Sequence, residues 1–100
     1  MAVIHKQKAS ITAASGSGTA TILAASGVMK QIFVKSATST TTFDVKLTDV
    51  HSLDIYETTA ITGVLNEMVD MPSYGNYTLT ISNASADEEL TYLLTFIEQF

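Results

Sequence analysis

TFDVKLTD, residues 42–49, gives the clearest indication of secondary structure in the chain. Apolar and polar side chains alternate along it, and the apolar ones are Phe43, Val45 and Leu47. Successive side chains of a β-strand point to opposite faces, so this alternation predicts a strand with one face in a core and the other in solvent. The same period of two recurs along most of the chain, for example in NYTLTISN, residues 76–83. We therefore predict a series of short strands.

Composition favours the same fold class. The 100 residues include 15 threonines and 10 serines against 15 charged residues, and 46% of the chain is hydrophobic. Threonine is β-branched and suits a pleated, half-exposed surface, whereas helical surfaces usually carry Glu, Lys, Arg and Gln. Turn signals divide the chain into seven or eight strands. We predict an all-β protein, a single small antiparallel β-sandwich or jelly-roll-like domain that spans residues 1–100.

Four segments need individual predictions. Residues 1–12 are expected to form an edge strand, or an arm that engages a neighbouring subunit. Residues 66–75, NEMVDMPSYG, contain the single proline and a glycine, which predicts a loop. Residues 85–100 match helical spacing as well as strand alternation, but their threonine and aromatic content favours a strand. In residues 28–35 we place three apolar side chains on one face and two on the other: Val28, Ile32 and Val34 against Met29 and Phe33.

ITAASGSGTATI, residues 11–22, resembles a phosphate-binding loop at first sight. A Walker A loop needs a lysine after its last glycine, but Gly18 is followed by Thr19. A dinucleotide fingerprint needs a third glycine where Thr21 stands, and it needs a helix to follow. We therefore predict a hairpin turn in which Gly16 or Gly18 adopts a positive φ.

Charge excludes several partners. The net charge is −5 and there is no arginine, the usual reader of bases and clamp of phosphates, so we expect no nucleic-acid binding. No segment is long enough to span a membrane, and the N-terminal stretch is too polar for a signal peptide, so we expect neither membrane nor secretion. Residues 1–43 carry four lysines and no acid, whereas residues 44–100 carry one lysine and all ten acids. We favour two halves that interleave in one fold over subunits that meet through faces of opposite sign.

No set of residues predicts catalysis, a cofactor or a metal. The chain has no cysteine, and no serine lies in a nucleophile elbow. Asp49, His51 and Asp54 are close in sequence, but two or three ligands beside a turn are a weak metal signal, and a solvated loop is the better interpretation. The acidic run at residues 87–89 lacks the alternating spacing of a calcium loop, so we expect a solvated turn or a rim at a subunit contact.

Five residues are candidates for a protein interface. Lys6 and Lys8 lie on the first predicted strand, and Met68, Met71 and Tyr74 lie in the predicted loop. Methionine-rich surfaces adapt to protein partners, which favours an interface there over a sugar site. The other tyrosines on apolar strand faces are expected in the core.

Several strand and turn motifs together resemble the small virion structural proteins of tailed bacteriophages. These are GTATI (18–22), GVMKQIFVK (27–35), TTTFDVKLTD (40–49) and YGNYTLTISNAS (74–85). The resemblance covers nearly the whole chain and implies a compact, non-enzymatic β-sandwich assembled in the host cytoplasm and located in the virion.

Three functions follow from these observations. The first is a capsid decoration or cement protein, a homo-oligomer such as a trimer that binds the major capsid protein or other virion proteins in many copies. The second is a neck, tail or fibre component of the same kind of particle. The third, from another class, is a small carbohydrate-binding β-sandwich, which predicts a line of exposed aromatic side chains and often bound Ca²⁺.

Overall fold

The structure, a computed structural model, describes residues 2–22, 27–73 and 75–99. It consists of eight strands and one short 3₁₀ turn, η1 (Ala14–Gly16). The strands are β1 (Ala2–Ala13), β2 (Gly18–Ile22), β3 (Gly27–Ser36), β4 (Thr42–Thr48), β5 (Asp54–Thr62), β6 (Val64–Ser73), β7 (Tyr77–Ser82) and β8 (Glu88–Gln99). In the described part of the chain no helix is long and apolar enough to cross a membrane.

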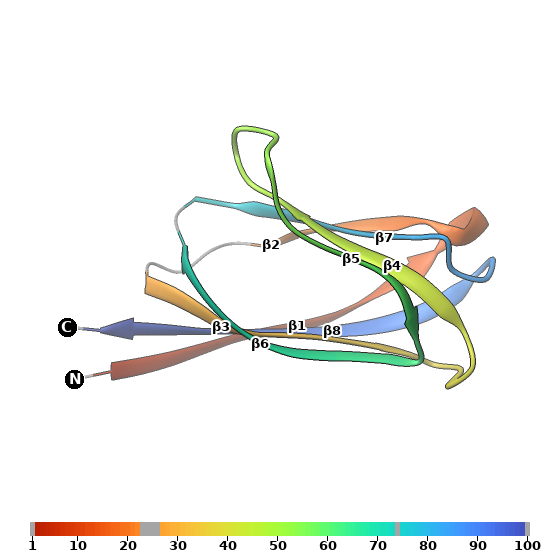
Figure 1. Cartoon of the computed structure of the whole chain (residues 1–100), viewed down its shortest axis with the longest axis horizontal. Coiled ribbons are helices and arrows are strands. Elements are labelled where there is room, and N and C mark those ends of the chain that lie inside the picture. The colour runs from red at the N-terminus through yellow and green to blue at the C-terminus, as the bar shows by residue number, and fades with distance from the viewer. Residues whose placement is uncertain (1, 23–26, 74, 100) are drawn as a thin grey trace.

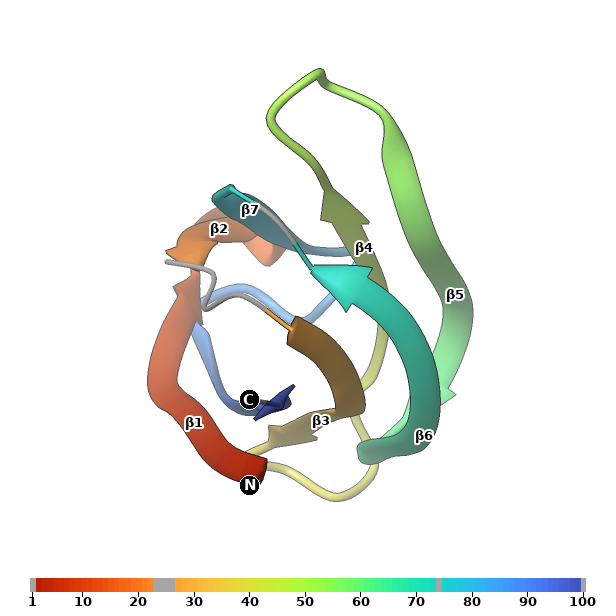
Figure 2. The ribbon, with the colours of Figure 1, turned by 90° about the vertical axis from the view of Figure 1, so that its left-hand side faces the viewer.

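The strands form two antiparallel sheets of four that pack face to face (Figures 1 and 2). Sheet A has the order β1-β8-β3-β6 and sheet B the order β2-β7-β4-β5. The pairing is nested, because β1 pairs with β8, β2 with β7, β3 with β6 and β4 with β5. This is the strand order of a jelly roll, so the predicted all-β sandwich is confirmed. The nesting also interleaves the lysine-bearing and acidic halves of the chain, as predicted.

One apolar core lies between the sheets. Along β4, the predicted inward residues Phe43, Val45 and Leu47 are all buried. Along β8, the alternate residues Leu90, Tyr92, Leu94 and Phe96 are buried, so residues 88–99 of the segment 85–100 form a strand and not a helix. Tyr77 and Tyr92 lie in this core, as their apolar strand faces predicted.

The prediction of a hairpin at ITAASGSGTATI is wrong. β1 belongs to sheet A and β2 to sheet B, so the turn carries the chain from one layer to the other. Gly16 has a φ of +89°, and a side chain there would meet the carbonyl oxygen of Ala84 at 2.7 Å. Gly18 has no positive φ but packs tightly against Ile11. The glycines therefore permit a tight crossing between layers.

The prediction of a loop at residues 66–75 is also wrong. Residues 64–73 form β6, which pairs with β3 along most of its length. Gly63, with a φ of +76°, is the corner between β5 in sheet B and β6 in sheet A. β6 is an edge strand of its sheet, a position that tolerates the proline that suggested a loop.

A bulge corrects the predicted faces of β3. The register shifts between Met29 and Gln31, which breaks the strict alternation of the strand. As a result Met29 is buried together with Ile32 and Val34, whereas Val28 and Phe33 are only partly covered. Val28 and Phe33 therefore belong to the outer side of sheet A.

A candidate protein-docking surface

The outer side of sheet A combines apolar side chains with lysines. Period-two alternation places these residues opposite the buried ones on the same strands. We call this surface the lysine face; its described apolar and lysine members are Ile4, Lys6, Lys8, Val28, Lys30, Phe33, Lys35, Val64, Met68, Leu93 and Ile97.

Apolar groups run across the lysine face in rows. Leu93 lies directly between Lys8 and Phe33 in the strand register, and Ile97 lies between Ile4 and Val28. Met68 is 72% exposed and Ile4 61%, values unusual for large apolar side chains in a folded chain. An exposed cluster of this kind is typical of an interaction site.

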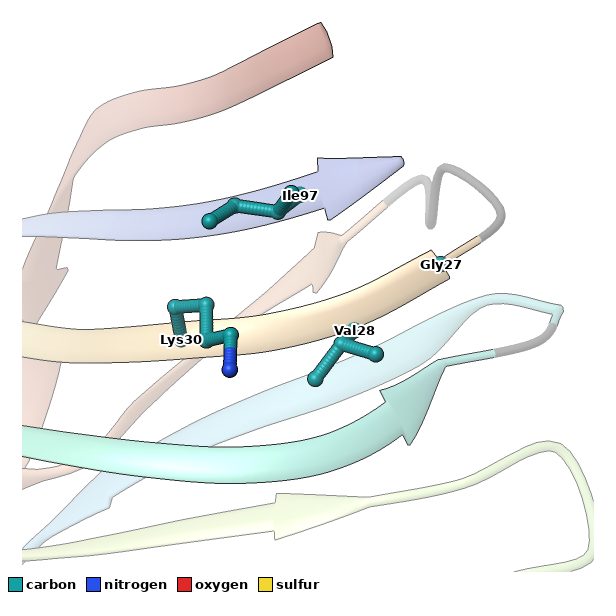
Figure 3. Close-up of a pocket in the computed structure, with 4 residues that line it drawn as sticks. All are labelled: Gly27, Val28, Lys30 and Ile97. Carbon is teal, nitrogen blue, oxygen red and sulfur yellow. The ribbon is translucent and has the colours of Figure 1, made fainter. Parts of the chain in front are cut away.

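The end of the face near the chain termini is hollowed. An open hollow of about 250 Å³ is lined by Gly27, Val28, Lys30 and Ile97. Figure 3 shows the aliphatic side chains of Val28 and Ile97 on neighbouring strands with the Lys30 side chain beside them. The described lining offers one cation and apolar carbon, and no pair of groups that could perform acid–base chemistry.

Among the residues that the structure describes, three of the four lysines on this face have no carboxylate partner. Lys30 pairs with Asp70, with 2.6 Å between Nζ and Oδ1. Lys6, Lys8 and Lys35 form no ion pair with any residue that the structure describes. Since the chain has twice as many acids as lysines, this separation is a property of the fold and not a shortage of acids.

The polar groups in the middle of the face satisfy one another. Thr95 donates a hydrogen bond to the Gln31 side chain over 3.0 Å, and Gln31 donates to Asn66 over 2.9 Å. These groups hold β8, β3 and β6 in register. The lysines and the apolar groups are therefore what the face offers to a partner.

The outer side of sheet B differs completely. Its members are mostly hydroxyls and acids: Thr19, Thr21, Asp44, Lys46, Thr48, Glu57, Thr78, Thr80 and Ser82. We call it the threonine face. The register places Thr21 beside Thr78 and Thr78 beside Thr48, so hydroxyls form rows across the sheet. None of the large apolar side chains found exposed in the described residues lies on it.

Asp44 on the threonine face holds an irregular position of β5. Its carboxylate accepts hydrogen bonds from the backbone N–H of Ala60 and from the Asn83 side chain. These bonds, the backbone one first, lower the pKa of Asp44. Ala60 has a positive φ of 57°, so the carboxylate also holds an unusual backbone conformation in place.

The loop between β4 and β5 is a second exposed apolar feature. Val50 is 52% exposed and Leu53 62%, and both precede β5, which begins at Asp54. The Asp49 carboxylate accepts from the backbone N–H groups of His51 and Leu53 at 2.9 and 3.0 Å. Asp49 is thus a turn-forming residue, and the described residues contain no group of three His, Asp or Glu side chains that could hold a metal.

Glu88 has a structural role that the sequence did not reveal. Its carboxylate accepts hydrogen bonds from the hydroxyls of Ser36, Thr38 and Thr41 and from the Thr38 backbone N–H. These bonds, led by that from Ser36, lower the pKa of Glu88. The acidic run that we expected to be solvated therefore ties the β3–β4 loop to the start of β8.

Tyr56 and Glu67 link the two sheets at their β5 and β6 edges. The Tyr56 hydroxyl donates to the Glu67 carboxylate and accepts from Thr58. Partial burial, followed by the bond to Glu67, raises the pKa of Tyr56. The pair closes one open side of the sandwich, and no nucleophile and base adjoin it among the residues described.

The predicted interface residues separate into two groups. Lys6, Lys8 and Met68 lie together on the lysine face. Met71 is half-buried and packs against the core from the inner side of β6. Tyr74 lies outside the described residues. The prediction missed Phe33 and Leu93, because alternation alone does not tell which face of a strand lies in the core.

Known structures share this architecture. The pre-peptidase C-terminal domain of the collagenase from Bacillus anthracis is 16% identical, with a TM-score of 0.57, over 94% of this chain and 88% of that domain. The Yersinia pseudotuberculosis-derived mitogen is 14% identical, with a TM-score of 0.53, over 100% of this chain and 90% of the mitogen. A carbohydrate-binding module, CBM36 in complex with calcium and xylotriose, is 12% identical with a TM-score of 0.41, over 98% of this chain and 99% of the module.

These likenesses define the fold class only. No protein-family model matches the sequence, and no curated protein matches it either. At such low identities the first two structures establish a shared β-sandwich, and the TM-score of the third is too low to support an argument about a ligand. Function therefore has to be argued from the surfaces of this chain.

Proposed function

We propose that this chain is a non-enzymatic structural protein of a tailed-phage virion, a decoration protein that binds the head shell in many copies through its lysine face. The observation that carries the proposal is the exposed apolar surface with unpaired lysines, beside an absence of convergent catalytic groups in the described residues. The sequence motifs that resemble virion proteins support the virion part of the proposal. Jelly rolls recur in viral capsid domains, which agrees with it by analogy.

Adhesion to a repetitive shell requires only a modest binding free energy from each copy. Leu93 and Phe33 would supply the apolar centre of the contact, and Lys6 and Lys8 a charged rim. Rim charges mainly set the association rate and its dependence on salt, whereas the apolar centre sets the dissociation rate. Repetition over a symmetric shell makes modest individual contacts strong in total.

The first experiment is quantitative mass spectrometry of the particles released by cells that carry the gene. Hundreds of copies in each particle support a decoration protein. A handful of copies support the alternative of a neck, tail or fibre component. Complete absence from purified particles overturns the virion proposal.

The second experiment tests the surface. Lys8→Glu should weaken shell binding at low salt, and the difference from the unmodified chain should shrink as salt is added. Lys46→Glu is the matched control, because it makes the same charge change on the threonine face. Equal loss in both variants, or no loss in either across the salt titration, contradicts docking through the lysine face.

A carbohydrate-binding function is the second candidate. The rows of hydroxyls and carboxylates on the threonine face are groups that hydrogen-bond sugars. However, Phe33 and Tyr56 are the only described aromatic side chains outside the core, and they lie on different sheets. A glycan array probed with and without Ca²⁺ tests this candidate, and specific binding that Thr78→Ala and Thr80→Ala abolish would establish it over the adhesive one.

A further inference from the structure

We infer that the lysine face of one copy binds the β4–β5 loop of a second copy, so that chains associate head to tail. The inference rests on the proposed function in one respect, since it takes the lysine face to be adhesive. It adds the identity of an occupant: residues 49–54 of another copy, an apolar tip followed by the exposed carboxylate of Asp54.

The charge of the face selects its partner. Its four lysines lie with two described carboxylates, Asp70 and Glu89, so the face is positive although the chain as a whole carries −5. A phosphate polymer is a poor match, because the chain has no arginine and its net negative charge repels one. A protein surface with carboxylates around an apolar patch matches both features of the face.

The face is a poor partner for itself. In a two-fold symmetric contact the same patch lies on both copies, so one net positive face would meet another. Net charges of the same sign oppose association. We therefore take the occupant to be a different surface, which makes the contact heterologous.

The β4–β5 loop is a surface of the required kind. Val50 and Leu53 are both more than half exposed, and Asp54 follows with its side chain 53% exposed. Asp54 is held only loosely by its own chain, with the Lys46 Nζ at 3.9 Å and the Thr48 hydroxyl at 3.2 Å. In the docked pair, Leu53 would cover Phe33 and Leu93, and Asp54 would face Lys8.

The loop is shaped before it binds. Besides the two bonds to the Asp49 carboxylate, the Asp49 N–H donates to the Leu53 carbonyl over 2.9 Å and the Ser52 N–H donates to the Asp49 carbonyl over 3.1 Å. Ser52 takes a positive φ of 63° within this turn. Two backbone–backbone bonds and two bonds to the Asp49 carboxylate thus fix how Val50 and Leu53 project, which lowers the conformational entropy lost on docking.

The loop and the face cannot meet within one molecule. In Figure 1 the β4–β5 loop projects from the layer of sheet B, on the side of the sandwich away from sheet A. Each copy therefore offers one β4–β5 loop that can dock on another copy and one lysine face that can receive the loop of another copy. Such contacts close into a ring, of which a trimer is one case, or continue as a filament.

Two blocked variants test the inference by mixing. The face-blocked variant is Lys6→Glu with Lys8→Glu, and the loop-blocked variant is Val50→Lys with Leu53→Lys. All four side chains are exposed or more than half exposed, so both variants should fold, which circular dichroism and thermal unfolding check. Association is measured by sedimentation velocity over a wide concentration range, with Thr19→Glu plus Thr21→Glu on the threonine face as the control for added negative charge.

The unmodified chain should associate, and each blocked variant alone should need at least about tenfold more protein for half association. An equimolar mixture of the two should form a capped dimer, since each supplies the surface that the other lacks. A mixture that stays monomeric, or an unmodified chain that never associates, overturns the inference. Shell binding can persist in either case. Failure of the mixing experiment therefore rejects self-association alone, and the proposed function is tested separately by copy number and shell binding.

Discussion

The lysine face and the threonine face are outer sides of two four-stranded sheets in one small protein, yet they share almost no chemistry. The lysine face exposes Ile4, Val64 and Met68 and leaves three lysines without an ion pair among the described residues. The threonine face carries hydroxyls and carboxylates, which water solvates well. A sheet that only needs to face water resembles the second surface, so the first is the one that calls for a partner.

The difference originates in the topology. Lys6, Lys8, Lys30 and Lys35 lie on β1 and β3, which both belong to sheet A. The strand between them in sequence, β2, belongs to sheet B and carries threonines. A charge asymmetry along the chain thus becomes an asymmetry between two faces, because β1, β2 and β3 alternate between the layers.

The core common to both faces gives the largest expected effect. Phe96 in sheet A and Phe43 in sheet B are both buried, so Phe→Ala at either site should lower the free energy of unfolding by about 3–5 kcal/mol. Urea titration followed by circular dichroism measures the loss. A large loss at one site and almost none at the other would mean that the sheets do not share a core.

The second largest effect on stability is expected at Gly63, the corner between β5 in sheet B and β6 in sheet A. Gly63→Ala should cost about 1–3 kcal/mol through its positive φ, and its new methyl group would also overlap the Ser39 carbonyl oxygen. Gly75→Ala is the matched control, because its φ is also positive but the atom met, at 2.9 Å, belongs to the Val50 side chain. We expect the greater loss of thermal stability at Gly63, and the reverse order would contradict this description of the corner.

Acid should loosen the end of sheet A at Glu88. The hydrogen bonds lower its folded-state pKa beneath the ordinary value of 4.5, so their stabilisation is fully present above pH 4.5 and is lost as the pH falls through the lowered pKa. Glu88→Gln should therefore be less stable than the unmodified chain at neutral pH and should lose less stability on acidification. Thermal unfolding between pH 7 and pH 2 measures both slopes.

Glu89→Gln controls for the change in net charge next to Glu88. If its stability profile matches that of Glu88→Gln, the hydrogen bonds to the β3–β4 loop are not the source of the acid dependence.

The smallest expected effects on stability compare Lys30, which forms an ion pair, with Lys8, which forms none with a described residue. Lys30→Ala should cost only about 0.2–1 kcal/mol, since its ion pair with Asp70 is exposed. Lys8→Ala should leave the free energy of unfolding within about 0.5 kcal/mol of the unmodified chain. Unfolding in urea at low and high salt checks both, and a large cost at Lys8 would show that it acts in folding and not in docking.

The sequence predicted the fold class because alternation is a local property. TFDVKLTD and NYTLTISN identified inward residues correctly, since each strand is regular and central in its sheet. β6 was missed because its proline suggests a loop, although an edge strand tolerates one. The β1–β2 turn was misjudged because glycine-rich turns serve hairpins and layer crossings alike.

The candidate site was only half predictable. Lys6, Lys8 and Met68 stood out as exposed residue types. Phe33 and Leu93 did not, because their position on the outer side depends on the β3 bulge and on which face of β8 packs inward. Glu88 was interpreted as solvated, since its partners in residues 36–41 are about 50 positions away along the chain.

The nested pairing also sets an order of folding. β4 and β5 are adjacent in sequence and can close as a hairpin in microseconds, whereas residues 2–13 must await residues 88–99. Contacts this distant raise the contact order and slow folding. On a ribosome, β1 would leave the exit tunnel with its partner strand still unsynthesised, and the lysines on it would keep that unpaired strand from adding to other chains until the sheet closes.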